Sequence, residues 1–185
     1  MRNVHKQTQP LPRIYSFPFV AREDARVLIL GTAPSAASLA AGFNYAHPRN
    51  AFWPIMFALF GGGAPSAAAD WESRRALLLS NRVALWDVAR ACAREGSADS
   101  SIRDAEANDI PGLLNACPGI GMIFLNGQKA AALFRKLAEP ALTERQSMIP
   151  RATLPSTSPA RAEPLAAKLE KWQAIRAFLD TQMET

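Results

Sequence analysis

The order of apolar and polar positions along the chain predicts a protein in which strands alternate with helices. Continuous apolar runs closed by small or polar residues are typical of buried parallel strands, and they occur at 26–31, 82–88 and 120–127. A fourth, more polar strand is expected near 147–155. Apolar residues at helical spacing predict helices at 35–42, 53–60, 70–81, 128–139 and 163–183. This order predicts an α/β fold with a central, mainly parallel four-stranded sheet that helices cover on both faces.

The length predicts a single domain. The chain has 185 residues, of which 49% are hydrophobic and 20% charged, enough for one buried core and too few for two. Residues 1–20 are rich in proline ("QPLPRIYSFPF") and predict an extended lead-in. We therefore expect the domain itself to span residues 21–185.

Composition argues against several classes of protein. The longest apolar runs are far shorter than the roughly 20 residues of a membrane-spanning helix, and the first ten residues lack an apolar export signal. Cys92 and Cys117 lie far apart, without a C-x-x-C spacing or a histidine cluster. We therefore expect no membrane association, no metal and no cofactor, and a reducing, cytoplasmic setting.

The net charge is compatible with a polyanionic partner but does not require one. The formal charge is +5 and the pI is near 9.7. The excess is concentrated near the two ends: residues 1–20 carry three basic side chains and no acid, and residues 147–176 carry five basic side chains against two glutamates.

Polar and small residues gather where the predicted strands end, which is where parallel sheets bind ligands. GTAPS (31–35) begins a helix, and the exposed backbone amides of a helix start can also hold a ligand oxygen. Asp87 either caps a following helix, the interpretation we favour, or faces the cleft. Asn126 before glycine is typical of a turn, yet its amide can also recognise the edge of a nucleobase.

Two further segments also have two interpretations each. LPSTSPA (154–160) is either a plain proline–serine loop or one whose hydroxyls and amides hold DNA phosphates; the hydroxyl residues are Ser156, Thr157 and Ser158. In YAHPRNAFW (45–53), Pro48 keeps the backbone of His47 extended, and this histidine stabilises the turn, contacts a substrate or takes part in catalysis. Asn50 in the same segment is either a turn residue or a chemical one.

Four segments, VLILGTAPSAASLAAGFNYAHPRNAFWPIM, ALWDVARACAREGSADSSI, IFLNGQKAAALF and LPSTSPA, together resemble the uracil-DNA glycosylase superfamily. More closely, they resemble its hypoxanthine-DNA glycosylase branch, also called DNA-deoxyinosine glycosylase. The resemblance runs from about residue 26 to 176, and its most specific part is YAHPRNAFW paired with LPSTSP. It implies a three-layer α/β/α domain that flips a damaged nucleotide out of duplex DNA into a pocket at the strand ends.

The resemblance also implies roles for single residues. Residues 31–35 match the first motif of the superfamily, whose third position in many relatives is a water-activating Asp or Asn but here is Ala33. Asn50 matches the asparagine that takes over this role in the hypoxanthine branch, and Asn126 matches the asparagine that recognises the base. Residues 154–160 match the loop that compresses the DNA backbone, although Arg161 stands where that branch often has asparagine. The remaining residues expected at the substrate are Gly31, Thr32, Pro34, Tyr45, His47 and Phe52.

The resulting hypothesis is a monofunctional DNA repair glycosylase. Water attacks C1′ of the sugar, the base leaves as an anion, and an abasic site remains. No lysine occupies a motif position, so lyase chemistry is not expected. We expect Tyr45 and Phe52 to stack on the flipped base, Trp53 to belong to the core, and a monomer to act on double-stranded DNA containing hypoxanthine, uracil or xanthine. The alternatives are a non-catalytic DNA- or nucleotide-binding module on the same scaffold and, ranked last, a small-molecule hydrolase that uses Asp87.

Overall fold

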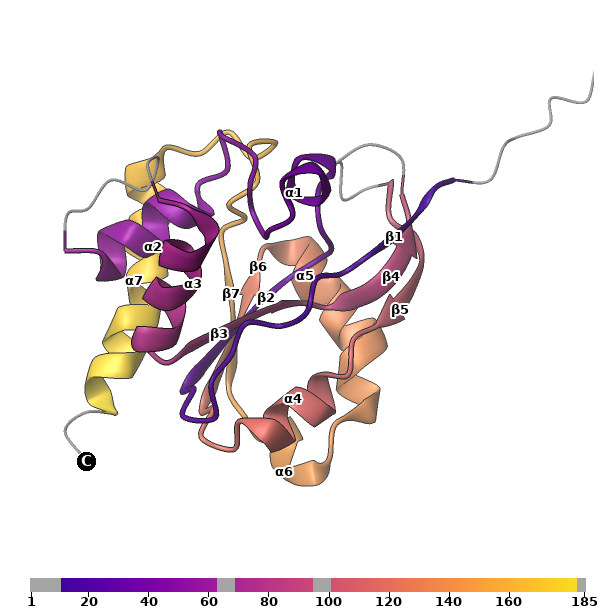
Figure 1. Cartoon of the computed structure of the whole chain (residues 1–185). Helices are drawn as coiled ribbons and strands as arrows, with labels where there is room; N and C mark the ends of the chain where they lie inside the picture. The colour runs from indigo at the N-terminus through magenta and orange to yellow at the C-terminus, as the bar shows by residue number, and fades with distance from the viewer. Residues whose placement is uncertain (1–10, 63–68, 95–100, 183–185) are drawn as a thin grey trace, which may run out of the picture.

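A four-stranded parallel sheet forms the centre of the molecule (Figure 1). The computed structural model describes residues 11–62, 69–94 and 101–182. In spatial order the strands are β3 (Val83–Asp87), β2 (Val27–Gly31), β6 (Met122–Asn126) and β7 (Arg151–Leu154). All three neighbouring pairs are parallel, and β2 is buried along its whole length. The predicted central sheet is therefore confirmed.

Helices cover both faces of this sheet and produce two hydrophobic cores. Because successive side chains of a strand point to opposite faces, Val27 and Ile29 join one core while Leu28 and Leu30 join the other. On one side lie α2 (Phe52–Phe60), α3 (Trp71–Ser80) and α7 (Leu165–Thr181). On the other lie α4 (Ile110–Ala116), α5 (Gln128–Leu133) and α6 (Glu144–Ser147) (Figure 1). The predicted three-layer α/β/α architecture is confirmed.

The polar ends of the strands carry the segments of the predicted site. After β2, α1 (Ala36–Ala41) begins where the Ser35 hydroxyl accepts a hydrogen bond from the Ser38 amide. It ends at Gly42, whose φ of 79° places it in the left-handed region. The segment between α1 and α2 then runs beside the segment between β7 and α7 at the top of the view in Figure 1. The Ala51 amide donates to the Thr157 carbonyl across this junction (3.0 Å).

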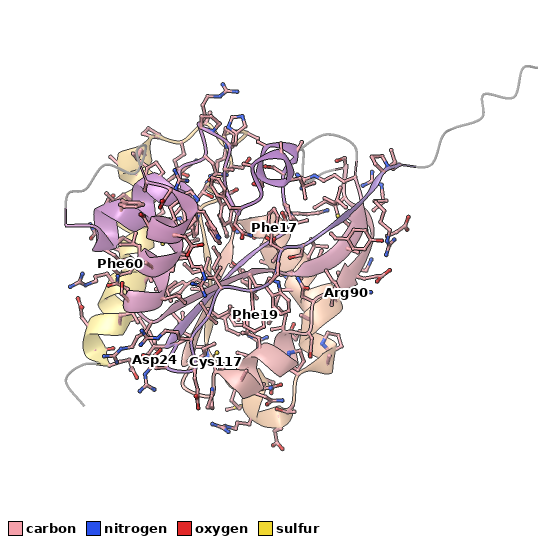
Figure 2. All side chains as sticks on the ribbon, in the orientation of Figure 1. Phe17, Phe19, Asp24, Phe60, Arg90 and Cys117 are labelled. Carbon is pink, nitrogen blue, oxygen red and sulfur yellow. The ribbon has the colours of Figure 1, made fainter. Side chains whose placement is uncertain are left out.

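A second sheet was not expected from the sequence. It is antiparallel, in the order β1 (Arg13–Tyr15), β4 (Ala89–Ala93) and β5 (Arg103–Ala107). Of the predicted extended lead-in, Arg13–Tyr15 therefore belongs to a sheet, while residues 1–10 lie outside the described residues. Figure 2 shows Phe17 and Phe19 on the segment that follows β1. The Trp86 indole donates to the Phe17 carbonyl (2.8 Å), so this segment is bonded to the central sheet.

Two further predictions need correction. Asp87 caps no helix, because the chain turns directly from β3 into β4 and the Val88 amide donates to the Gly31 carbonyl (2.9 Å). The single helix expected at 128–139 is instead α5 followed by a π-helical turn (Phe134–Ala138) and a 3-10 turn (Glu139–Ala141), which contains Pro140 near its start. In the described part of the chain, no helix is both long and apolar enough to cross a membrane.

Candidate active site

A cavity of about 340 Å³ opens at the carboxyl ends of the central strands, within the usual size range of ligand sites. The structure brings most of the predicted site residues to its walls; these are Gly31, Thr32, Ala33, Pro34, Tyr45, His47, Asn50, Asn126, Ser156, Thr157 and Ser158. Phe52 does not line it. Ser38, Asn44 and Arg94 do, although no motif pointed to them. Asp87 also lines the cavity, which is the interpretation of this residue that we did not favour.

The first wall, residues 31–35, is fixed mainly by the turn between β3 and β4. The amides of Val88 and Ala89 donate to the carbonyls of Gly31 and Thr32, at 2.9 and 3.0 Å. A Cβ atom at Gly31 would lie 2.5 Å from the Tyr45 hydroxyl and 2.6 Å from Asp87 Oδ1, so a larger residue would have to displace both side chains. The Tyr45 hydroxyl and the Asp87 carboxylate therefore both lie directly beside Gly31.

Arg94 adds a side-chain tie from beyond β4 to this wall. It follows β4 and is only 3% exposed. Its Nη1 donates to the carbonyl of Pro34 at 3.1 Å and to that of Ala33 at 3.4 Å. A guanidinium is always charged, so this contact also places a buried positive charge at the cavity.

The aromatic residues of YAHPRNAFW form a stack that leads from the cavity into the core. Tyr45 lines the cavity and lies on Phe52, with ring centroids 4.1 Å apart and planes 17° from parallel. Phe52 is fully buried and makes T-shaped contacts with Trp53 and Trp172. Phe52 therefore supports Tyr45 from behind, and Trp53 lies in the core as expected.

Asn50 proves to be a turn residue and a cavity residue at once. Its backbone N–H donates to the His47 carbonyl (2.8 Å), and its side-chain Oδ1 accepts from the backbone N–H of Phe52 at the start of α2 (3.0 Å). One lone pair of Oδ1 and the side-chain NH₂ remain for other partners. His47 Nδ1 accepts from the Arg49 amide (3.1 Å), so the neutral ring carries its proton on Nε2.

Asn126 and Thr157 join the second wall of the cavity, residues 155–161, to the end of β6. Asn126 Nδ2 donates to Thr157 Oγ1, and the Thr157 amide donates to Asn126 Oδ1, both at 2.9 Å. Thr157 is 1% exposed and Asn126 8%. Gly127 permits this close approach, because a Cβ atom there would lie 2.8 Å from the Cβ of Ser156. The amide of Asn126 is thus held in one orientation at the cavity.

Asp87 is a buried carboxylate at the cavity, 3% exposed. Ser16 Oγ and Asn44 Nδ2 lie 3.4 and 3.5 Å from its Oδ2 and are oriented to donate to it. The described residues contain no group of histidine, cysteine and acidic side chains that can hold a metal ion. Cys117 lies at the lower end of the view in Figure 2, and burial and nearby acids raise the pKa of its thiol, which opposes a nucleophilic role.

The model of the Uracil DNA glycosylase superfamily matches residues 17–180. The chain belongs to this superfamily. A Methanosarcina acetivorans protein named Hypoxanthine DNA glycosylase is 36% identical over 159 residues, which cover 86% of this chain and 95% of the relative. A Methanosarcina barkeri protein of the same name is 34% identical over 114 residues, 62% of this chain and 71% of the relative.

A solved structure of a superfamily member agrees with the fold. The solution NMR structure of a candidate uracil DNA glycosylase from Methanosarcina acetivorans superposes with a TM-score of 0.73 at 32% identity. The match covers 90% of this chain and 99% of that chain. The resemblance predicted from the sequence is confirmed. The enzyme class is confirmed with it, because the protein is a DNA glycosylase. This interpretation is favoured over a non-catalytic binding module.

Proposed function

We propose that this DNA glycosylase acts as a monomer on double-stranded DNA and removes deaminated bases, hypoxanthine first among them, to leave an abasic site. The relatives named Hypoxanthine DNA glycosylase support the choice of base. The observation that carries the proposal is the cavity itself, in which one chain places Asn50 and Asn126 at the carboxyl ends of a parallel sheet. A cavity is needed because a base can react only after it has left the stack.

Asn50 is proposed to orient the attacking water. Its amide does not titrate in the useful range, so it cannot act as a strong base. It can hold a water molecule in position, because the Phe52 amide fixes its Oδ1 and leaves one lone pair available. A positioned weak nucleophile suffices when the bond to the base breaks before the water attacks.

Asn126 is proposed to recognise the base. Hypoxanthine, uracil and xanthine all present an N–H beside a carbonyl, and an amide can pair with both groups. The two bonds to Thr157 leave one N–H and one lone pair of Asn126 for the base. The same amide can donate to the departing base anion and so stabilise the transition state.

Tyr45 is proposed to stack on the base, with Phe52 behind it. A stacked base gains about 1–3 kcal/mol in comparable sites. Around the cavity, the exposed side chains of Arg49 and Arg161 are candidates for phosphate contacts, and the hydroxyls of Ser156 and Ser158 can add to them.

The experiment is an excision assay on duplexes that carry one deoxyinosine, deoxyuridine or deoxyxanthosine. The wild type should release the base from deoxyinosine and leave an abasic site. Asn50→Ala should slow this release by about 100-fold or more while it keeps the affinity for DNA. Loss of the bond to the Phe52 amide should lower the free energy of unfolding by only about 1 kcal/mol, so the variant stays folded. A wild type that binds all three duplexes and releases no base from any of them contradicts the proposal. Unchanged excision by folded Asn50→Ala contradicts the role of Asn50.

A further inference from the structure

Resting on the proposed function, we propose that Asp87 is a second catalytic group of this site. Its carboxylate supplies the negative charge that stabilises the sugar while the glycosidic bond breaks. Asn50 then positions the water, and the two roles lie on different segments of the chain.

The sheet places Asp87 where such a charge is useful. Asp87 is the last residue of β3 and pairs in register with Gly31, the last residue of β2. It therefore lies beside the segment that forms the first wall of the cavity. That wall offers no acid of its own, and Ala33 contributes only a methyl group.

Burial makes the charge effective. Asp87 is 3% exposed, and in the part of the chain that the structure describes it is the one carboxylate that lines the cavity. A charge removed from water interacts more strongly with a nearby opposite charge. The Ser16 hydroxyl and the Asn44 side-chain amide point at Oδ2. Oδ1 lies 2.6 Å from the position that a Cβ atom on Gly31 would occupy, and the Tyr45 hydroxyl lies 2.5 Å from the same position. Burial and these neighbours place the carboxylate at the cavity before substrate arrives.

The reaction creates the charge that this group matches. As the bond from C1′ to the base nitrogen breaks, its electron pair leaves with the base and the sugar becomes oxocarbenium-like. The water oxygen forms the new bond to C1′, and the proton that the water loses neutralises the base anion. The products are the free base and the abasic sugar. Asp87 faces the positive sugar during this sequence, and the buried guanidinium of Arg94 lies at the same cavity with the opposite sign.

The test separates charge from structure. Asp87→Asn keeps the shape and the hydrogen-bonding oxygen but removes the charge, and we expect it to lower the single-turnover rate on a deoxyinosine duplex by about 100-fold. The affinity for undamaged duplex should stay unchanged. Asp87→Ala opens space for a small anion, and sodium formate should restore part of its rate, whereas sodium chloride of equal ionic strength should not.

Asp104→Asn is the matched control. Asp104 is exposed on β5, and its φ of 47° is one that asparagine tolerates, so the wild-type rate is expected. An Asp87→Asn variant with the wild-type rate overturns the inference. So does a loss of rate that accompanies a lower unfolding temperature and does not respond to formate. A wild type without activity on any damaged duplex refutes the proposed function instead.

Discussion

The two walls of the cavity are held by different kinds of hydrogen bond. The first wall, residues 31–35, is fixed by backbone amides of the β3–β4 turn, with Arg94 as its side-chain tie. The second wall, residues 155–161, is fixed largely by side chains of other elements. These are Asn126 at Thr157, Trp172 at the Pro155 carbonyl (3.0 Å) and Lys168 at the Arg161 carbonyl (3.0 Å).

This difference determines how each wall responds to mutation. A bond between backbone groups survives most substitutions, whereas a bond from a side chain is lost with that side chain. The first wall should therefore tolerate change except at Gly31 and Arg94. Single substitutions at three sites, two of them on α7, should loosen the second wall.

Trp172→Ala should have the largest effect. Trp172 is fully buried, packs against Phe52 and bonds the second wall, so its loss should lower the free energy of unfolding by about 3–5 kcal/mol. Denaturant unfolding measures this change. Trp172→Phe is the control, because it retains most of the packing and loses only the bond to Pro155. Equal losses for Phe and Ala would show that the hydrogen bond, not the packing, dominates.

Among substitutions that affect the first wall through a side chain, Arg94→Met should lower the stability of the protein most. It leaves two carbonyls without their charged donor, and we expect a loss of about 1.5–3 kcal/mol in the free energy of unfolding. Arg90→Met is the matched control, because Arg90 is an exposed arginine on the same antiparallel sheet (Figure 2). If Arg94→Met and Arg90→Met have the same free energy of unfolding, the backbone bonds hold this wall without help from Arg94.

Thr157→Val should affect catalysis more than stability. It keeps the shape and the backbone amide but removes the oxygen that accepts from Asn126 Nδ2. This loss should lower the free energy of unfolding by about 1 kcal/mol. Because Asn126 then loses part of its fixed orientation, excision of hypoxanthine should slow. Thr157→Ser, which retains the hydroxyl, should behave like wild type in both assays. A slow Ser variant would assign the effect to the missing methyl group.

Lys168→Met should have the smallest effect at neutral pH. Burial lowers the pKa of Lys168, so the charged form carries a cost in the folded state that offsets its bond to Arg161. Since the folded pKa lies below the unfolded value, this cost is present below the folded pKa and disappears as pH rises toward the unfolded value. The wild type should therefore gain stability relative to the Met variant in that range. A difference in the free energy of unfolding between wild type and Lys168→Met that stays constant with pH would contradict this.

The central sheet could be predicted because buried parallel strands have a distinctive pattern. Residues 27–31 form a continuous apolar run, and few structures other than a strand covered on both faces accommodate one of that length. Asn50 and Asn126 were identified because they stand at fixed places in recognisable motifs. Both line the cavity.

The antiparallel sheet and the positions of Asp87 and Arg94 could not be predicted, because they depend on contacts between distant parts of the chain. ARACA (89–93) and RDAEA (103–107) have little intrinsic preference for strands, and they form β4 and β5 because they pair with each other and with β1. The cap predicted at Asp87 failed for the same reason, since the chain enters β4 where a helix was expected. Arg94 follows β4, so its place at the cavity could not be inferred either.

The bond between Asn126 and Thr157 has a consequence for undamaged DNA. Deamination of adenine replaces an amino group with a carbonyl and adds a proton to the neighbouring ring nitrogen, which exchanges donor and acceptor on that edge. A freely rotating asparagine can turn its amide by 180° and pair with either base. Here the Thr157 amide can only donate, so it requires Oδ1 to stay where it is. With Asn126 as the group that recognises the base, the backbone of Thr157 makes normal adenine a mismatch for the pocket.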